Sequence, residues 1–334
     1  MYIFLRGSEN MPFENVIKRA AIGATVALSL KGIRNDPKRS IRNTVDLFDC
    51  FTKGIFDESL LSRIRQDVGN PKSCLFNTVM AMVQNVDHSI LKTVGTDLCY
   101  NRVAVFTNQK KPKKEILTRK AACKAAESLN DAVKYGKELG VYFYVISGHR
   151  PLNHRNEILA VCRDNPDCAF FLQMDERDVD ENFVKEAAKA ENIILSVNVC
   201  ANFFSDQLFQ NYSQTFRILK KHHCLYGYSV RIDAKKGLLF CQKKFIDLMV
   251  KCGCLFGWYF NGFEEKQPYF KAVRSMIRSA STAGSPLLLL NKGSDDRLTE
   301  RFTAGGRCYL FFGKKRLKIK YRLAAAKNGG AVRA

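Results

Sequence analysis

The sequence predicts an α/β protein, a whole or partial (β/α) barrel that follows an N-terminal helical segment. From about residue 94, short apolar segments typical of buried strands alternate with longer segments of helical periodicity. Before that point, apolar residues recur at helical spacing alone. At 334 residues, with 46% hydrophobic and 26% charged residues, the chain can bury one large core or two modest ones.

Residues 1–93 are expected to form a helical N-terminal region. The segment 36–55 places Ile41, Val45 and Phe48 at near-helical spacing. The segment 57–68 opens on an aspartate, a residue type that caps helices. No chemistry is visible in this region.

The apolar run 20–30 resembles the core of a signal peptide because it follows Lys18 and Arg19. It begins late, however, and lacks a convincing cleavage site. It is also too short to span a bilayer, which takes about 20 residues. We therefore expect a packed or interfacial helix and no transmembrane segment, with weak membrane association as the alternative.

Residues 94–265 are expected to form the α/β core. The expected strands are 102–107, 141–148, 168–174, 193–199, 225–232 and 255–260. The expected helices between them are 114–140, 155–166, 180–192, 215–223 and 242–253. This alternation predicts a parallel sheet with buried strands, and a doubly wound open sheet is the competing architecture. In either architecture the loops after the strands carry the site.

Residues 266–334 are expected to complete the core and to end in a basic tail. A helix at 269–281 and a strand at 286–290 precede the segment "AGGRCYLFF" at 304–312. The segment "GKKRLKIKYR" follows at 313–322, and the final residues resemble a frayed terminus.

Charge and cysteine content limit the partners and the compartment. Lysine and arginine number 54 against 32 acidic residues, so a formal charge of +22 makes this a basic protein suited to an anionic partner. That partner would be nucleic acid, acidic lipid or an acidic protein. The twelve cysteines are dispersed with no CxxC pair, which favours reduced thiols and a cytoplasmic setting.

The segment "VISGHRPLNH" reads as a buried strand, a glycine turn and a cluster of His149, Arg150, His154 and Arg155. The two arginines predict an anion site, because guanidinium groups bind phosphate or carboxylate in a bidentate manner. The two histidines suggest metal or proton chemistry. The alternative is that these side chains are ordinary surface residues of a strand-to-helix loop.

Two basic segments form a second candidate anion site. We expect RNA or anionic lipid to bind them through neutralised phosphates, and a solvated charged face is the alternative. The lysines concerned are Lys110, Lys111, Lys113, Lys114, Lys318 and Lys320. No GxxxxGK[ST] loop, GxSxG elbow or HExxH helix occurs. This absence removes the commonest NTPase, hydrolase and metalloprotease interpretations.

The stretch 96–320 resembles a radical S-adenosylmethionine (SAM) protein of the barrel type. The landmarks occur in order: "TDLCYNR", "YGKELGVYFYVISGHRPL", "PDCAFFLQMDERDVDENFVKEAAKAENI", "LSVNV", "FIDLMVKCGCLFGWYF" and "AGGRCYLFF". The resemblance implies a radical-SAM-like (β/α) barrel with SAM as cofactor and a [4Fe–4S] cluster held by a CxxxCxxC motif.

The residues at the family's cluster positions do not preserve its chemistry. Cys99 stands at the first cysteine position, but Val103 and Phe106 stand at the other two, and neither side chain ligates iron. The resemblance therefore implies Cys99 as the metal ligand while arguing against a cluster. In the enzyme alternative, distant cysteines such as Cys123 or Cys200 complete a noncontiguous set of ligands.

The positions that the resemblance assigns to SAM have also changed. Its Gly-Gly-Glu-Pro turn reads Gly148, His149, Arg150 and Pro151, so a cation replaces a carboxylate. At about 4 Å and an effective dielectric near 20, such a like-charge contact costs roughly 4 kcal/mol. Asn198 stands where an acid is expected. We therefore expect a degenerate radical-SAM-like pseudoenzyme that serves as a binding or scaffold protein.

Overall fold

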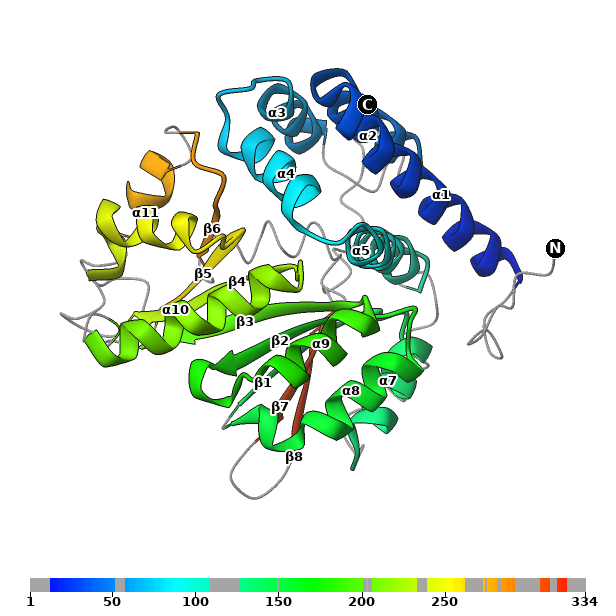
Figure 1. Ribbon diagram of the computed structural model, residues 1–334. Coiled ribbons are helices and arrows are strands. Elements are labelled where there is room, and N and C mark those ends of the chain that lie inside the picture. Colours follow the sequence, from blue (N-terminus) through cyan, green and yellow to red (C-terminus); the bar gives the residue numbers. More distant parts are fainter. Residues whose placement is uncertain are drawn as a thin grey trace.

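The structure is a computed structural model in which an eight-stranded sheet carries helices on both faces (Figure 1). It describes residues 13–51, 58–108, 127–148, 150–200, 203, 206–232, 239–261, 273, 275–280, 284–291, 307–312 and 317–322.

The helices fall into two groups along the chain. The first group is α1 (Phe13–Asn35), α2 (Pro37–Phe51), α3 (Glu58–Val68), α4 (Cys74–Asn85) and α5 (His88–Asn108). The second is α7 (Leu129–Glu138), α8 (Arg155–Asp164), α9 (Glu181–Ala190), α10 (Asp206–Lys221) and α11 (Lys243–Lys251), with 3-10 helices η1 (Pro151–His154) and η2 (Glu176–Asp178). Residues 273 and 275–280 are also helical, in agreement with the prediction for 269–281.

The strands follow one another across the sheet in nearly sequential order. They are β1 (Phe143–Gly148), β2 (Ala169–Asp175), β3 (Ile193–Val199), β4 (Tyr226–Ile232), β5 (Phe256–Asn261), β6 (Leu288–Asn291), β7 (Arg307–Phe312) and β8 (Leu317–Arg322). The order is β6-β5-β4-β3-β2-β1-β7-β8, and every neighbouring pair is parallel except β7 with β8. The sheet is open, so the expectation of a whole barrel is wrong: β6 and β8 are not paired with each other.

The sequential order explains why the connecting helices α8–α11 lie together. Each step from β1 to β5 moves in the same direction, and right-handed crossovers then place every connecting helix on the same face. Side chains alternate between faces along each strand. Tyr144 and Phe170 pack with the connecting helices, whereas Phe143 and Phe171 point to the other face. The core therefore has two layers, one on each side of the sheet.

Helix α5 covers the second face. Its buried Ile90 and Val94 pack with Phe171 and Trp258, and the helix contacts β1, β2 and β3. The expected strand at 102–107 is wrong, because these residues form the last turns of α5. The helix also spans the expected boundary between residues 93 and 94. Its Ile90 and Val94 belong to the second layer, whereas a separate apolar cluster lies among α1–α4 and consists of Ile33, Ile41, Val68, Phe76 and Val83.

The apolar run 20–30 lies within α1, which packs against α2 and α5. Ile22 is buried and Val26 packs on the main core, whereas Leu28 is 69% exposed. This arrangement confirms the packed helix. None of the described helices is long and apolar enough to cross a membrane.

A buried ionic network joins the first helices to the sheet. Arg19 of α1 pairs with Asp97 of α5 and donates to the backbone carbonyl of Asp167 at 2.9 Å. Lys137 of α7 pairs with the Asp167 carboxylate at 2.8 Å. Burial raises the pKa of Asp97 to about 7, although the Arg19 guanidinium lowers it. Four charged side chains thus meet where β2 begins.

Candidate ligand site at the carboxyl ends of the strands

A row of polar side chains crosses the sheet near the carboxyl ends of its strands. Asp175 of β2 pairs in register with Asn198 of β3, Asn198 with Ser229 of β4, and Ser229 with Trp258 of β5. By strand alternation, all four lie on the face that α5 covers farther back, where Phe171 and Trp258 pack. The carboxyl ends of parallel strands are where α/β folds place their ligands.

The sheet holds this row by hydrogen bonds between neighbouring strands. Asn198 Nδ2 donates to Asp175 Oδ1 at 3.0 Å. Gln173 Nε2 donates to Ser229 Oγ at 3.1 Å, and the hydroxyls of Ser196 and Ser229 lie 2.5 Å apart. Because Ser196 and Ser229 are buried, these bonds satisfy groups that would otherwise be costly to bury. These hydrogen bonds therefore hold the polar side chains of the row in place without a ligand.

Opposite charges lie at the outer end of the row. The Asp175 side chain is 27% exposed, and an Arg177 nitrogen lies 3.8 Å from its carboxylate. Arg231 follows Ser229 by two residues on the same side of β4 and is exposed. The arrangement offers one carboxylate, one amide and two guanidinium groups. Such a set can bind a small polar molecule that carries both donor groups and an anionic group.

Gly148 is required by the close approach of β7. Its φ is +136°, and a Cβ at this position would lie 2.4 Å from the carbonyl oxygen of Phe312 in β7. Only glycine adopts this conformation at so close an approach. Pro151, in the same predicted SAM turn, is buried at the start of η1. His149 lies outside the described residues.

The two arginines of the predicted anion site are each bound to a carboxylate. Arg150, which adopts a left-handed conformation with φ 48°, pairs with Asp178 at 2.8 Å. Arg155 pairs at 2.5 Å with Asp180, the residue that caps α9. An incoming anion would have to displace these carboxylates. His154 stacks on the ring of Phe312 at 4.4 Å, and the structure does not bring it into the polar row.

The structure does not place Cys99 in a cluster loop. The residue lies inside α5, where it is partly buried against the main core. Burial, with a smaller contribution from the Asp97 charge, raises the pKa of its thiol to about 12. Iron binding needs a thiolate. Val103, at the second cluster position, lies one turn farther along the same helix.

The other cysteines do not gather around Cys99. Among the described residues, no group of three or more histidine, cysteine or acidic side chains is placed to hold a metal ion. Cys200, proposed as a distant ligand, is exposed after β3 and lies 3.6 Å from the Tyr212 hydroxyl. Cys123 lies outside the described residues. The described donors therefore do not fit a [4Fe–4S] cluster.

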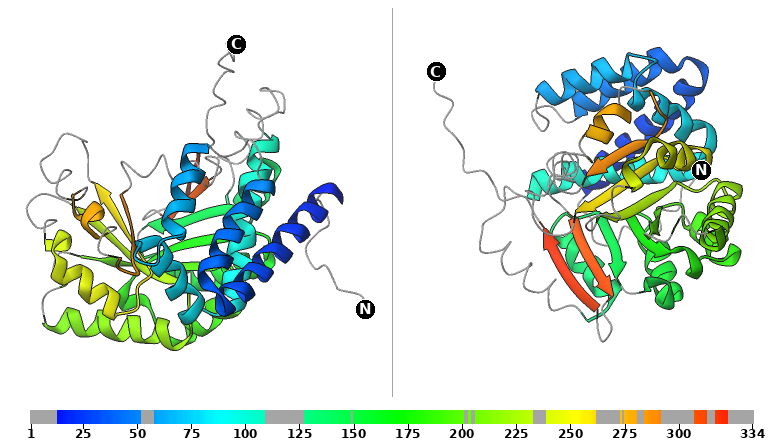
Figure 2. Two further views of the ribbon diagram at one scale, coloured as in Figure 1. Left: turned by 90° about the horizontal axis from the view of Figure 1, so that it is seen from above. Right: turned by 90° about the vertical axis from the view of Figure 1, so that its left-hand side faces the viewer.

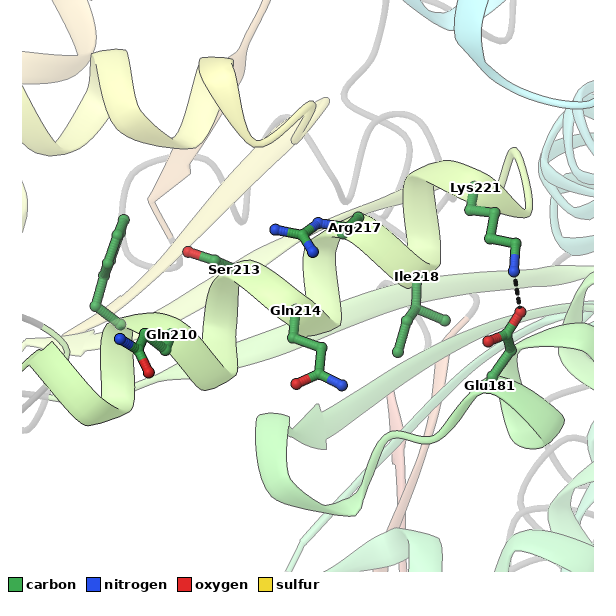
Figure 3. A pocket seen from close by; sticks show the side chains of 8 residues that line it. Glu181, Gln210, Ser213, Gln214, Arg217, Ile218 and Lys221 are labelled. Carbon is green, nitrogen blue, oxygen red and sulfur yellow. Dashed lines mark hydrogen bonds and ion pairs between the residues drawn. The ribbon is translucent and has the colours of Figure 1, made fainter.

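A separate groove of about 640 Å³ lies along α10 (Figure 3). Its lining comes from one side of α10 and the first residue of α9. Glu181 there pairs with Lys221, and His222 Nε2 lies 3.3 Å from the same carboxylate oxygen. The groove shares no residue with the polar row. The residues that line it are Glu181, Phe209, Gln210, Ser213, Gln214, Arg217, Ile218 and Lys221.

Most of the residues in the basic segments predicted to bind a polyanion lie outside the described residues. Lys110, Lys111, Lys113 and Lys114 lie outside the described residues. Lys318 lies on β8 and is exposed, and the backbone register places Lys320 opposite Tyr309 of β7.

The comparisons with known proteins leave the family open. No family model matches the sequence, and no curated protein matches it. Among solved structures, one entitled "Crystal Structure of Phosphonopyruvate Hydrolase" is similar over 52% of this chain and 83% of its own, with 10% sequence identity and a TM-score of 0.29. A likeness at this level assigns neither fold nor activity.

Sequence reasoning found Asn198 but missed Gln173, Ser196, Ser229 and Arg231. These polar residues lie at alternate positions of strands whose other residues are mostly apolar. That alternation toward the end of a parallel strand was the available signal, because both faces of such strands are usually apolar.

Proposed function

We propose that this chain is a degenerate relative of the barrel-type radical SAM proteins and acts as a binding or scaffold protein without cluster-dependent catalysis. The observation that carries the proposal is Cys99. The residue at the first cluster position stands inside a packed helix with a thiol pKa of about 12, and the second position, Val103, is an apolar residue of the same helix.

The sheet supports the kinship with a barrel. Six parallel strands in sequential order, with the connecting helices on one face, are what a (β/α) barrel would show if it were opened. We propose that the chain is a partial barrel of this kind. The polar row then corresponds to a barrel mouth, where such folds bind their ligands.

The mouth supports a small polar ligand, and SAM is the first candidate. Asp175 accepts a bond from Asn198 and keeps oxygen lone pairs for an ammonium group of the ligand. Arg231 offers a guanidinium group to a carboxylate. An amino-acid-like end carries both groups. In this proposal the chain holds the molecule without cleaving it.

Anaerobic reconstitution with iron and sulfide tests the loss of cluster chemistry. We expect substoichiometric iron, no broad absorption near about 400 nm and no cleavage of SAM. Four irons per chain together with SAM cleavage would overturn the proposal. The enzyme alternative with noncontiguous ligands expects Cys99→Ala to abolish iron incorporation and Cys252→Ala to leave it intact. Equal iron in the two variants rejects that alternative.

Calorimetric titration with SAM tests the ligand. Asp175→Asn and Arg231→Ala should each weaken binding by about tenfold or more, because each removes one charged partner. Asn182→Ala, at an exposed position of α9, is the matched control and should bind as the parent does. Unchanged affinity in both mouth variants would remove the polar row as the site.

A further inference from the structure

The hairpin β7–β8 forms one end of the sheet and leaves one of its faces open. β7 pairs with β1 on one side and with β8 on the other, and the strand order ends at β8. Figure 2 shows the two strands side by side at the border of the molecule, in red and orange-red. Directly opposed residues of an antiparallel pair point to the same face.

The two faces of this hairpin differ in composition. On the face toward the connecting helices, Leu310 opposes Ile319 and Phe312 opposes Leu317, and all four pack on the main core. On the other face, register places Phe311 opposite Lys318 and Tyr309 opposite Lys320. Aromatic and basic residues therefore alternate on the second face.

The aromatic and basic residues of the second face reach solvent. The side chain of Phe311 is 44% exposed, although large aromatic residues are normally buried. Its neighbour Lys318 is also exposed, and Tyr309 is partly buried. The guanidinium carbon of the buried Arg307 lies 5.8 Å from the centre of the Tyr309 ring. The ring of Phe311 thus lies opposite Lys318 on an accessible part of the strand surface, whereas Arg307 is buried.

The sequence around the hairpin is uniformly basic. Residues 301–334 contain ten lysines or arginines and no aspartate or glutamate. The four residues that join β7 to β8 read Gly-Lys-Lys-Arg. The side chains of residues 301–334 therefore carry a formal charge of +10. The charge therefore favours an anionic partner.

We propose that the open face of the β7–β8 hairpin binds single-stranded nucleic acid. One base stacks on the ring of Phe311, and Lys318 contacts a phosphate. Aromatic platforms beside a positively charged track are how proteins bind single strands without sequence preference. The inference is independent of the ligand proposed for the strand ends.

Other partners fit this face less well. Lysines on an edge strand disfavour pairing with a strand of another protein. A duplex keeps its bases stacked on one another, so the Phe311 ring would have no base to contact. A bilayer would need a continuous apolar patch, whereas the register places the exposed Lys318 directly opposite Phe311.

Fluorescence anisotropy with the full chain tests the proposal. The probes are an oligouridylate of about 12 nucleotides, within the range of known single-strand sites, and a duplex RNA of equal length. Vesicles of phosphatidylserine and phosphatidylcholine form the third arm, measured by flotation. The variants are Phe311→Ala and Lys318→Ala. Leu28→Ala, at a 69% exposed position of α1, and Lys251→Ala, at an exposed position of α11, are the matched controls.

We expect the single strand to bind more tightly than the duplex. Phe311→Ala should weaken single-strand binding by about fivefold to a hundredfold at an unchanged salt slope, because stacking carries no counterion term. Lys318→Ala should reduce the slope of log affinity against log salt by about 0.7. Both controls should bind as the parent does, and melting temperatures should confirm that every variant folds.

Three results would overturn the inference. The first is unchanged single-strand affinity in Phe311→Ala. The second is equal or tighter binding of the duplex, which would indicate a charge-only contact. The third is binding to vesicles without binding to oligouridylate. Loss of SAM binding in the strand-end variants has no bearing on these measurements, so the two proposals fail separately.

Discussion

Gly148 shows at the scale of one residue that backbone packing alone can require a glycine. The residue occupies the glycine of a predicted cofactor turn, yet its neighbours are the backbone atoms of Phe312. A Cβ there would meet three of them at less than 3.0 Å. The glycine is therefore required by the approach of β7, whatever the turn binds.

We expect Gly148→Ala to destabilise the protein by at least about 2 kcal/mol. The substitution combines a positive φ with contacts to rigid backbone that cannot move aside. Urea denaturation of the variant and the parent measures the difference. Gly23→Ala is a suitable control, because a Cβ there would come no closer than 3.5 Å to its neighbours, which are side-chain atoms of Thr96. Equal midpoints for Gly148→Ala and the parent would contradict this assignment.

Asp97 predicts a pH dependence of stability. Burial raises the folded-state pKa of Asp97 to about 7, well above the usual range of an aspartate. A carboxyl with a raised pKa binds its proton more tightly when folded, so its contribution is full below about pH 4 and is lost as the pH rises through 7. Between pH 5 and 8 we expect this group alone to lower the free energy of unfolding by about 2 to 3 kcal/mol.

Urea denaturation at pH 5 and pH 8 measures this effect. Asp97→Asn cannot ionise, so its stability should change less between the two pH values than that of the parent. Asp247→Asn, at an exposed position of α11, controls for the loss of one carboxylate. A parent and an Asp97→Asn variant with the same pH dependence would show that Asp97 does not titrate in this range.

At the scale of elements, the sequence predicted the strands better than it predicted α5. Apolar segments such as 141–148 and 193–199 became β1 and β3, because β-branched and aromatic residues between helices fit a buried parallel strand. The segment 102–107 has the same short apolar character but belongs to a 21-residue helix. Local pattern does not separate a buried helix from a buried strand over so few residues.

The candidate site was predicted only in part, because contacts between elements cannot be derived from the local sequence pattern. The alternation of elements located the strand ends, and only the resemblance to radical SAM proteins pointed to Asn198 among them. The sequence did not indicate that Asn198 binds Asp175, since that contact depends on the β2–β3 register. Nor did it indicate that carboxylates of η2 and α9 bind Arg150 and Arg155. Pairing across elements is a tertiary property.

Because α5 packs on the sheet, we expect truncation of one of its buried side chains to lower the free energy of unfolding strongly. Ile90 is 2% exposed between α5 and the sheet, so Ile90→Ala should lower the free energy of unfolding by about 2 to 4 kcal/mol. Ile17→Ala, at a 53% exposed position of α1, should change it by less than about 0.5 kcal/mol. Denaturant titration of the two variants decides whether α5 is part of the core. If both substitutions lowered the free energy of unfolding by similarly small amounts, α5 would lie outside the core.

At the scale of the whole molecule, the first helices and the sheet should unfold together. Contacts between them occur at separate places: Asn77 Nδ2 donates to the Gly284 carbonyl at 2.9 Å, and the Asp87 amide donates to the His223 carbonyl at 2.9 Å. Arg19 and α5 add the ionic network and the second core layer. These contacts cross the expected boundary between residues 93 and 94 at several places.

The single tryptophan makes this cooperativity measurable. Trp258 is buried on the face that α5 covers, so its fluorescence reports that layer, whereas far-ultraviolet circular dichroism reports all helices. We expect the two signals to follow one denaturation curve with one midpoint. A helical transition that precedes the fluorescence change would show that α1–α4 unfold on their own.

The position of β7 beside β1 also sets an order of events during synthesis. Strands β1 to β6 can join the sheet one after another as they leave the ribosome, because each pairs with the strand before it. The other edge of β1 must wait for residue 307, about 160 residues after β1 ends at Gly148. At about 5 to 20 residues per second, that edge stays bare for roughly 10 to 30 seconds. We expect chaperones that shield exposed strands to bind nascent chains stalled within this interval, and to leave once β7 has emerged.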